Sequence, residues 1–104
     1  MAFKIIWSEQ ARGDLEAIVL FIARDNPRVA ESFGYLLISK VDVLAQFPLI
    51  GRVVPEEGDE AVREIIFRSY RIIYQVLAQK QIVAIARLWH GARGEPELPG
   101  ELNF

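Results

Sequence analysis

The sequence contains no cysteine, a single histidine and no long apolar run, and each of these absences removes a class of protein. Without cysteine the chain can form neither a disulfide, nor a thiolate nucleophile, nor a Cys-ligated zinc site. The lone histidine, His90, has no second imidazole with which to share a metal, so we expect no metal site. No segment approaches the roughly 20 apolar residues that span a bilayer, and the N-terminus lacks the apolar core of a signal peptide. We therefore expect a soluble, cytoplasmic protein that makes no membrane contact.

Motifs for cofactors and for activated serines are missing as well. Gly13, Gly34 and Gly51 stand alone rather than in a phosphate-binding loop, and none of the serines lies in a nucleophile elbow. We therefore expect no cofactor and no small-molecule substrate.

What the sequence does offer is enough apolar material for one globular domain, residues 1–104. The chain has 104 residues, of which 52% are apolar and 25% are charged, and this length fits a single core. Twelve basic against fourteen acidic side chains give a net charge of −2 and an isoelectric point near 5.4. Any contact with a nucleic acid must therefore be local rather than spread over the whole surface.

The N-terminal half has the pattern of a strand followed by two helices. Phe3 to Trp7 is a short run of strand-favouring residues, and Ser8 is a good helix N-cap. Apolar residues at spacings of three and four predict a helix from about Glu9 to Arg24. Asn26-Pro27 ends this helix and begins a second, which continues to Phe47-Pro48. The pair predicts an antiparallel helical hairpin.

The C-terminal half changes to a period of two. Strands are predicted at Val62 to Phe67, Tyr70 to Ala78 and Ile82 to Trp89, separated by short polar breaks that favour antiparallel connections. Residues 51–60 read as a surface loop, and residues 94–104 as an irregular tail over the surface. The order β-α-α-β-β-β predicts a two-layer α+β fold, with an N-terminal strand and a helical hairpin packed on a mainly antiparallel sheet.

Basic side chains gather in the predicted sheet. Residues 61–94 carry six basic side chains against one acidic, Glu64, a local balance of +5, whereas residues 1–48 carry five basic and six acidic side chains. Arginine forks suit phosphate or carboxylate, although some of these arginines would also pair with the acidic loop. His90, at a strand end, could take part in acid–base chemistry or simply bond the neighbouring turn. The candidate target-binding residues are Arg63, Arg68, Arg71, Arg87, His90 and Arg93.

Both predicted helices carry continuous apolar runs, at residues 19–22 and 35–38, that cover more than one helix face. Such a surplus is either covered by a partner protein or used inside the domain's own core, and the sequence leaves both alternatives open.

Six short motifs follow one another along the chain. They are Trp7-Ser8-x-x-Ala11-x-x-Asp14-Leu15-x-x-Ile18, Asn26-Pro27, Phe47-Pro48-x-x-Gly51-Arg52, Arg63-Glu64, Tyr70-Arg71-Ile72-Ile73-Tyr74-x-Val76 and His90-Gly91-x-Arg93. This ordered set resembles the RelE/ParE superfamily of bacterial toxin–antitoxin toxins, often labelled plasmid stabilisation proteins, over nearly the whole chain. The resemblance implies the β-α-α-β-β-β fold and a cognate antitoxin that binds the toxin as a hetero-oligomer and neutralises it.

The resemblance to the RelE-like branch, ribosome-dependent messenger-RNA endonucleases, is partial. Arg71 matches the arginine that such toxins carry after this tyrosine, but Glu64 and Ile66 replace the lysines that they often place in the first of the three strands. No tyrosine follows Tyr74, and the low isoelectric point is unusual for a protein that binds among ribosomal phosphates.

The ending His90-Gly91-Ala92-Arg93 looks like the ParE-like branch, whose members inhibit DNA gyrase by binding it. The preferred prediction is therefore growth arrest by gyrase binding, with Arg71, Arg87, His90 and Arg93 among the contacts and no catalytic group. The alternative is RNA cleavage on the ribosome with its messenger RNA, with Arg71, His90 and Arg93 in acid, base and phosphate-clamping roles. A third possibility is an inactive member that only binds its antitoxin.

Overall fold

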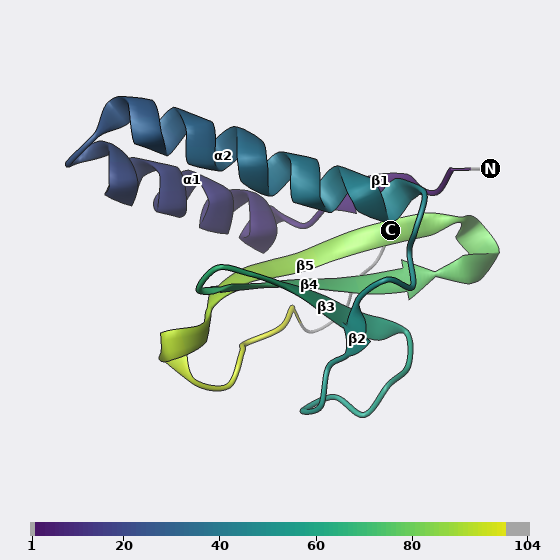
Figure 1. Ribbon diagram of the computed structural model, residues 1–104. Coiled ribbons are helices and arrows are strands. Elements are labelled where there is room, and N and C mark those ends of the chain that lie inside the picture. Colours follow the sequence, from purple (N-terminus) through teal and green to yellow (C-terminus); the bar gives the residue numbers. More distant parts are fainter. Residues whose placement is uncertain (1, 100–104) are drawn as a thin grey trace.

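The computed structural model describes residues 2–99, which form two layers (Figure 1). In chain order the elements are β1 (Lys4–Trp7), α1 (Glu9–Ala23), α2 (Pro27–Asp42), β2 (Arg52–Val53), β3 (Val62–Phe67), β4 (Tyr70–Leu77) and β5 (Ile82–His90), with single 3-10 turns at Val43–Ala45, Ala78–Lys80 and Gly91–Arg93. The two helices lie side by side on one face of the sheet (Figure 1). Within residues 2–99, neither helix has the length and apolarity to cross a membrane.

The sheet has five strands in the order β1-β5-β4-β3-β2. β1 pairs with β5 in parallel, and every other neighbouring pair is antiparallel. The α+β prediction, with a helical hairpin on a mainly antiparallel sheet, is thus confirmed. The prediction of an uninterrupted surface loop at residues 51–60 is wrong at its start, because Arg52 and Val53 form a short strand that pairs with β3. A strand of two residues is too short to show any period in the sequence.

Both predicted helix caps are present, and one of them also joins the two layers. The Ser8 hydroxyl accepts a hydrogen bond from the Ala11 N–H at 3.0 Å and donates to the Ala86 carbonyl on β5 at 2.8 Å. The Asn26 side chain accepts from the Val29 N–H at 3.2 Å, and Pro27 follows as the first helical residue. The cap that begins α1 therefore also fixes the start of that helix against the sheet.

Apolar side chains fill both faces of the sheet. The larger cluster lies between the helices and the sheet and includes Leu37, Val41 and Ile72. A smaller cluster on the opposite face contains Val54, Ile73, Ala86 and Trp89, with Val62 and Leu98 packed against it. The described part of the predicted tail, residues 94–99, has no regular secondary structure and runs beneath this face (Figure 1). Residues 100–104 of that prediction lie outside the described residues.

Candidate functional site

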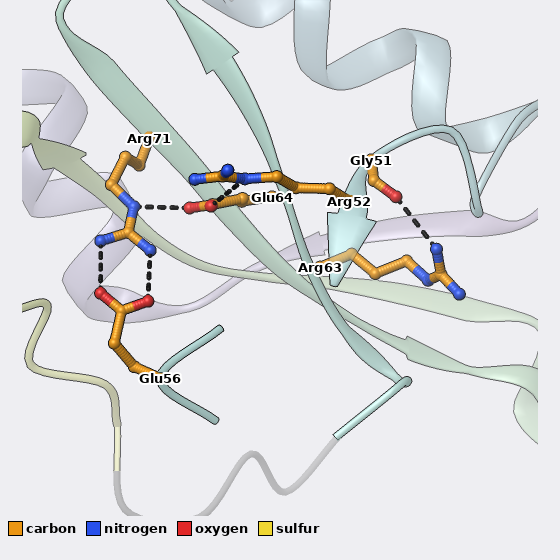
Figure 2. Close-up of polar contacts among 6 residues, drawn as sticks. All are labelled: Gly51, Arg52, Glu56, Arg63, Glu64 and Arg71. Atoms are coloured by element: carbon orange, nitrogen blue, oxygen red, sulfur yellow. Dashed lines mark hydrogen bonds and ion pairs between the residues drawn. The ribbon is translucent and has the colours of Figure 1, made fainter. Parts of the chain in front are cut away.

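A buried carboxylate, Glu64, lies at the centre of a polar network on the sheet face opposite the helices (Figure 2). Its side chain is fully buried, and it accepts hydrogen bonds from Arg52 Nε at 2.6 Å and from Arg71 Nε at 2.5 Å. Arg52 lies directly opposite Glu64 on β2, whereas Arg71 reaches it diagonally from β4. Two guanidinium groups offset the cost of burying one carboxylate, so Glu64 and its partners join three strands.

The outer edge of Arg71 binds a second carboxylate. Its Nη1 and Nη2 donate to the two Glu56 carboxylate oxygens, each at 2.8 Å, in the parallel two-bond geometry typical of strong arginine–carboxylate pairs. The hydrogen bonds from Arg71 lower the pKa of Glu56 to about 2, and the same pair raises the pKa of Arg71. All three guanidinium nitrogens of Arg71 therefore contact carboxylates of its own chain.

Arg63 is directed away from this network, toward the segment before β2 (Figure 2). Its Nη1 donates to the Gly51 carbonyl at 3.0 Å, and its Nε donates to the Glu60 carbonyl at 3.0 Å. The Gly51 N–H donates in turn to the buried Tyr74 hydroxyl at 2.9 Å. Residues from three of the motifs, 51–52, 63–64 and 70–74, thus form one intramolecular assembly that holds β2 against β3 and β4.

Arg87 is paired at the opposite edge of the sheet, on β5. Its Nε and Nη2 donate to the Asp14 carboxylate of α1 at 2.7 and 2.9 Å, and the Leu88 N–H donates to the same carboxylate at 2.9 Å. β1 pairs only with residues 82–85 of β5, so Asp14 replaces a neighbouring strand beyond that point. The hydrogen bond with Asp14 raises the pKa of Arg87.

Arg68, His90 and Arg93 lie at one end of the sheet, where β3 turns into β4 and where β5 ends. Arg68 has φ +52°, and its guanidinium lies over the rings of Phe33 and Phe67 at 5.8 and 5.3 Å. Arg93 lies 3.9 Å from the centre of the Trp89 ring. Among residues 2–99, no ion pair with a carboxylate forms at any of these three candidates.

A hollow of about 170 Å³ between α1 and the sheet brings His90 and Arg93 together with Tyr70 and Phe21. The His90 ring lies edge-on to Tyr70 with 5.1 Å between ring centres, and its Nδ1 accepts from the Ala92 N–H at 3.1 Å. Phe21 is 66% exposed. We call Arg68, Tyr70, His90 and Arg93 the turn-end surface.

The structure does not bring Arg71 and His90 together. The β4–β5 register pairs Tyr70 with His90 and Arg71 with Trp89, so consecutive side chains point to opposite faces of the sheet. Tyr70 packs toward the helices, whereas Trp89 lies in the cluster on the other face. The three residues of the endonuclease alternative therefore do not share one face. The target-binding role of the six candidate residues stays a prediction.

The sequence predicts that some of these arginines pair with the acidic loop, and the Arg71–Glu56 pair confirms this. It does not single out Asp14, a motif position, as the partner of Arg87. The apolar runs of the helices are partly exposed: Leu20, Phe21 and Tyr35 are 59%, 66% and 68% exposed, so the core does not bury these side chains.

In the part of the chain that the structure describes, no group of three or more acidic, histidine or cysteine side chains is arranged to hold a metal.

Comparisons with known proteins give a consistent result. Residues 5–94 match the family described as the ParE toxin of the type II toxin–antitoxin system parDE. Toxin RelE1 of Caulobacter vibrioides is 30% identical over 91 residues, which cover 88% of this chain and 96% of the relative. The solved chromosomal ParDE toxin–antitoxin system of P. aeruginosa superimposes with a TM-score of 0.70 at 20% identity, over 86% of this chain and 96% of that one. A mutant E. coli toxin RelE in the free state gives a TM-score of 0.61 at 22% identity, over 90% and 88% of the two chains.

Proposed function

The chain belongs to the ParE toxin family of type II toxin–antitoxin systems, within the RelE/ParE superfamily, and we propose that it arrests growth in the bacterial cytoplasm by binding DNA gyrase. The turn-end surface is the proposed contact with gyrase. A cognate antitoxin protein, bound as a hetero-oligomer, neutralises the toxin.

The observation that carries this proposal is which arginines are bonded to carboxylates of their own chain and which are exposed. Phosphodiester cleavage requires an acid, a base and a cationic clamp within hydrogen-bond reach of one phosphate. Arg71 instead donates to Glu64 and Glu56, and it lies on the face opposite His90. An inhibitor that works by binding needs only exposed side chains with unused hydrogen-bonding and charge capacity, and Arg68 and Arg93 meet this requirement.

The antitoxin part of the proposal rests on the family and on the exposed apolar helix residues. The matched family and the P. aeruginosa structure are both described as parts of toxin–antitoxin systems. Leu20, Phe21 and Tyr35 offer large apolar side chains that a partner could bury.

Two assays on the purified protein test the target. Under the proposal, the protein inhibits supercoiling of relaxed plasmid by gyrase, and it leaves messenger RNA on translating ribosomes intact. Heat-denatured protein is the control for both assays. Codon-specific cuts in ribosome-bound messages, with supercoiling unaffected, would reject gyrase as the target. Healthy growth of cells that express soluble protein without an antitoxin would identify an inactive member.

A second candidate function is ribosome-dependent RNA cleavage, and one observation favours it. The hollow beside α1 unites an imidazole, a phenol and a guanidinium, from His90, Tyr70 and Arg93. This set excludes Arg71, so the cleaving residues would differ from the predicted ones. His90→Ala would then abolish RNA cuts, whereas a gyrase inhibitor would retain most of its binding surface.

A further inference from the structure

The Arg71 guanidinium has an inner edge, Nε, and an outer edge, Nη1 and Nη2, and the two edges bind different carboxylates. Its Nε is bonded to Glu64, which is fully buried, while its Nη1 and Nη2 are bonded to Glu56, whose side chain is 29% exposed. The Arg71 side chain itself is 13% exposed. The inner pair is therefore part of the core, and the outer pair lies where solvent and other molecules reach it.

Glu56 comes from an exposed loop rather than from the sheet. Residues 55–60 are all exposed, and the loop turns at Gly58, whose φ is +62°. The Val54 carbonyl accepts from the N–H groups of Glu57 and Gly58, and the apolar residues that pack into the sheet, Val54 and Val62, flank the loop. Arg71 thus holds the Glu56 side chain from a loop whose residues lie outside both buried apolar clusters.

An exposed apolar side chain and an exposed cation lie near Arg71, a combination that is common in protein–protein interfaces. Ile66, directly opposite Arg71 in the β3–β4 register, is 52% exposed. The Arg52 side chain is 61% exposed, and its bond to Glu64 uses Nε. An exposed apolar side chain on the neighbouring strand and a second cation bonded to the same Glu64 therefore accompany Arg71 on this part of the surface.

We propose that the outer edge of Arg71 is a docking site for an acidic side chain of the antitoxin, and that Glu56 occupies this site in the free protein as an internal competitor. The antitoxin itself is taken from the proposed function. When the acidic residue of the partner displaces Glu56, one carboxylate replaces another at Arg71, and an apolar neighbour in the partner packs on Ile66.

Charge favours an acidic protein segment over a nucleic acid as the occupant. The loop that covers the site carries Glu56, Glu57, Asp59 and Glu60 within five residues. A phosphodiester strand would bring a row of negative charges against this loop, whereas a peptide segment can offer Arg71 one carboxylate with apolar neighbours.

The test compares Glu56→Gln with Glu57→Gln, a neighbouring substitution that removes the same charge from the same loop. The probe is the synthetic peptide acetyl-Leu-Glu-Val-Glu-Leu-amide, with its Gln counterpart and a ten-residue oligothymidylate as comparisons. Binding is followed by NMR at the Arg71 Nε–Hε resonance and by calorimetry. We expect E56Q to bind the acidic peptide about tenfold more tightly than the unmodified protein, and E57Q to stay within about twofold.

A second variant separates a docking site from a mere change of charge. Arg71→Lys combined with E56Q keeps the cation but loses the two-bond fork, so the gain in peptide affinity should disappear. Circular dichroism melting verifies that both variants are folded. Equal gains in E56Q and E57Q, or no gain in either, would overturn the proposal, and a gain for the oligothymidylate alone would assign the site to nucleic acid.

The supercoiling assay is independent of this experiment. If the protein leaves gyrase unaffected while E56Q gains affinity for the acidic peptide, the gyrase proposal fails and the docking site stands. If gyrase is inhibited and E56Q gains nothing, only the docking site fails.

Discussion

Asp14 and Arg87 are 73 positions apart in the sequence, yet their side chains form a two-bond ion pair that joins α1 to β5. The same carboxylate accepts the Leu88 N–H, so one side chain satisfies three donors at the open edge of β5. Both side chains are only 13% exposed. A single acidic residue on the first helix therefore bonds the part of the β5 edge that β1 leaves unpaired.

Asp14→Asn should destabilise the protein by about 2 kcal/mol, because it leaves the Arg87 guanidinium without its counter-charge in a partly buried place. The measurement is the free energy of unfolding from urea titrations. Glu16→Gln is the matched control, since Glu16 is exposed on the same helix, and it should change stability by no more than about 0.5 kcal/mol. Identical midpoints for the two variants would show that the pair contributes nothing to stability.

Gly51 should be intolerant of any side chain. A Cβ at this position would lie 2.5 Å from the Glu64 carbonyl oxygen and 2.6 Å from the Tyr74 hydroxyl, and the first of these is backbone that cannot move aside. Gly51→Ala should therefore cost about 1–3 kcal/mol. Gly13→Ala is the control: nothing lies within 4 Å of its Cβ, so alanine inside α1 should stabilise the fold by about 0.5–1 kcal/mol. Urea unfolding of both variants checks the opposite signs.

The parts of the fold that the sequence predicts are those with local causes. Ser8 and Asn26 begin helices because their own side chains bond the first turn, and this signal needs no distant partner. The bounds of β3 match the prediction, and those of β4 and β5 differ from it by one residue, because the change to a period of two is visible within each segment.

The parts that could not be predicted depend on contacts between distant segments. Nothing in Lys4 to Trp7 indicates that this strand joins β5 in parallel. The sequence indicated that some arginines would pair with the acidic loop, but it did not indicate that Arg71 is the one that does so, nor that Arg87 pairs with a helix residue. Charge counted along the sequence therefore located the basic half correctly without showing which guanidinium groups remain available for a partner.

The Glu56–Arg71 pair should make stability depend on pH in acid. The pKa of Glu56 falls from 4.5 to about 2 in the folded protein because Arg71 donates to its carboxylate. A lowered folded-state pKa adds stability above pH 4.5 and loses it as the pH falls toward 2. We expect E56Q to be less stable than the unmodified protein by on the order of 1 kcal/mol at pH 7. Urea titrations at pH 7, 5, 4 and 3 should show this difference shrinking below pH 4.5, and a difference independent of pH would contradict the assigned cause.

Charge reversal offers the most direct test of the turn-end surface, provided that the reversed arginines are not structural. Arg71→Glu is unsuitable, because it would place a third carboxylate beside Glu64 and Glu56 and would unfold the network. Arg68 and Arg93 instead contact aromatic rings, which are worth about 0.5–1 kcal/mol each at exposed sites.

The double variant Arg68→Glu with Arg93→Glu should therefore stay folded, as judged by its unfolding midpoint, and lose at least about tenfold in inhibition of supercoiling. Lys4→Glu with Arg12→Glu makes the same change in net charge at exposed positions outside this surface, and it should retain inhibition. Equal loss in both double variants would mean that gyrase responds to overall charge. Full inhibition by the Arg68→Glu, Arg93→Glu variant would place the contact elsewhere on the protein. An arginine that contacts an acidic group of gyrase would, when replaced by glutamate, repel that group and weaken binding.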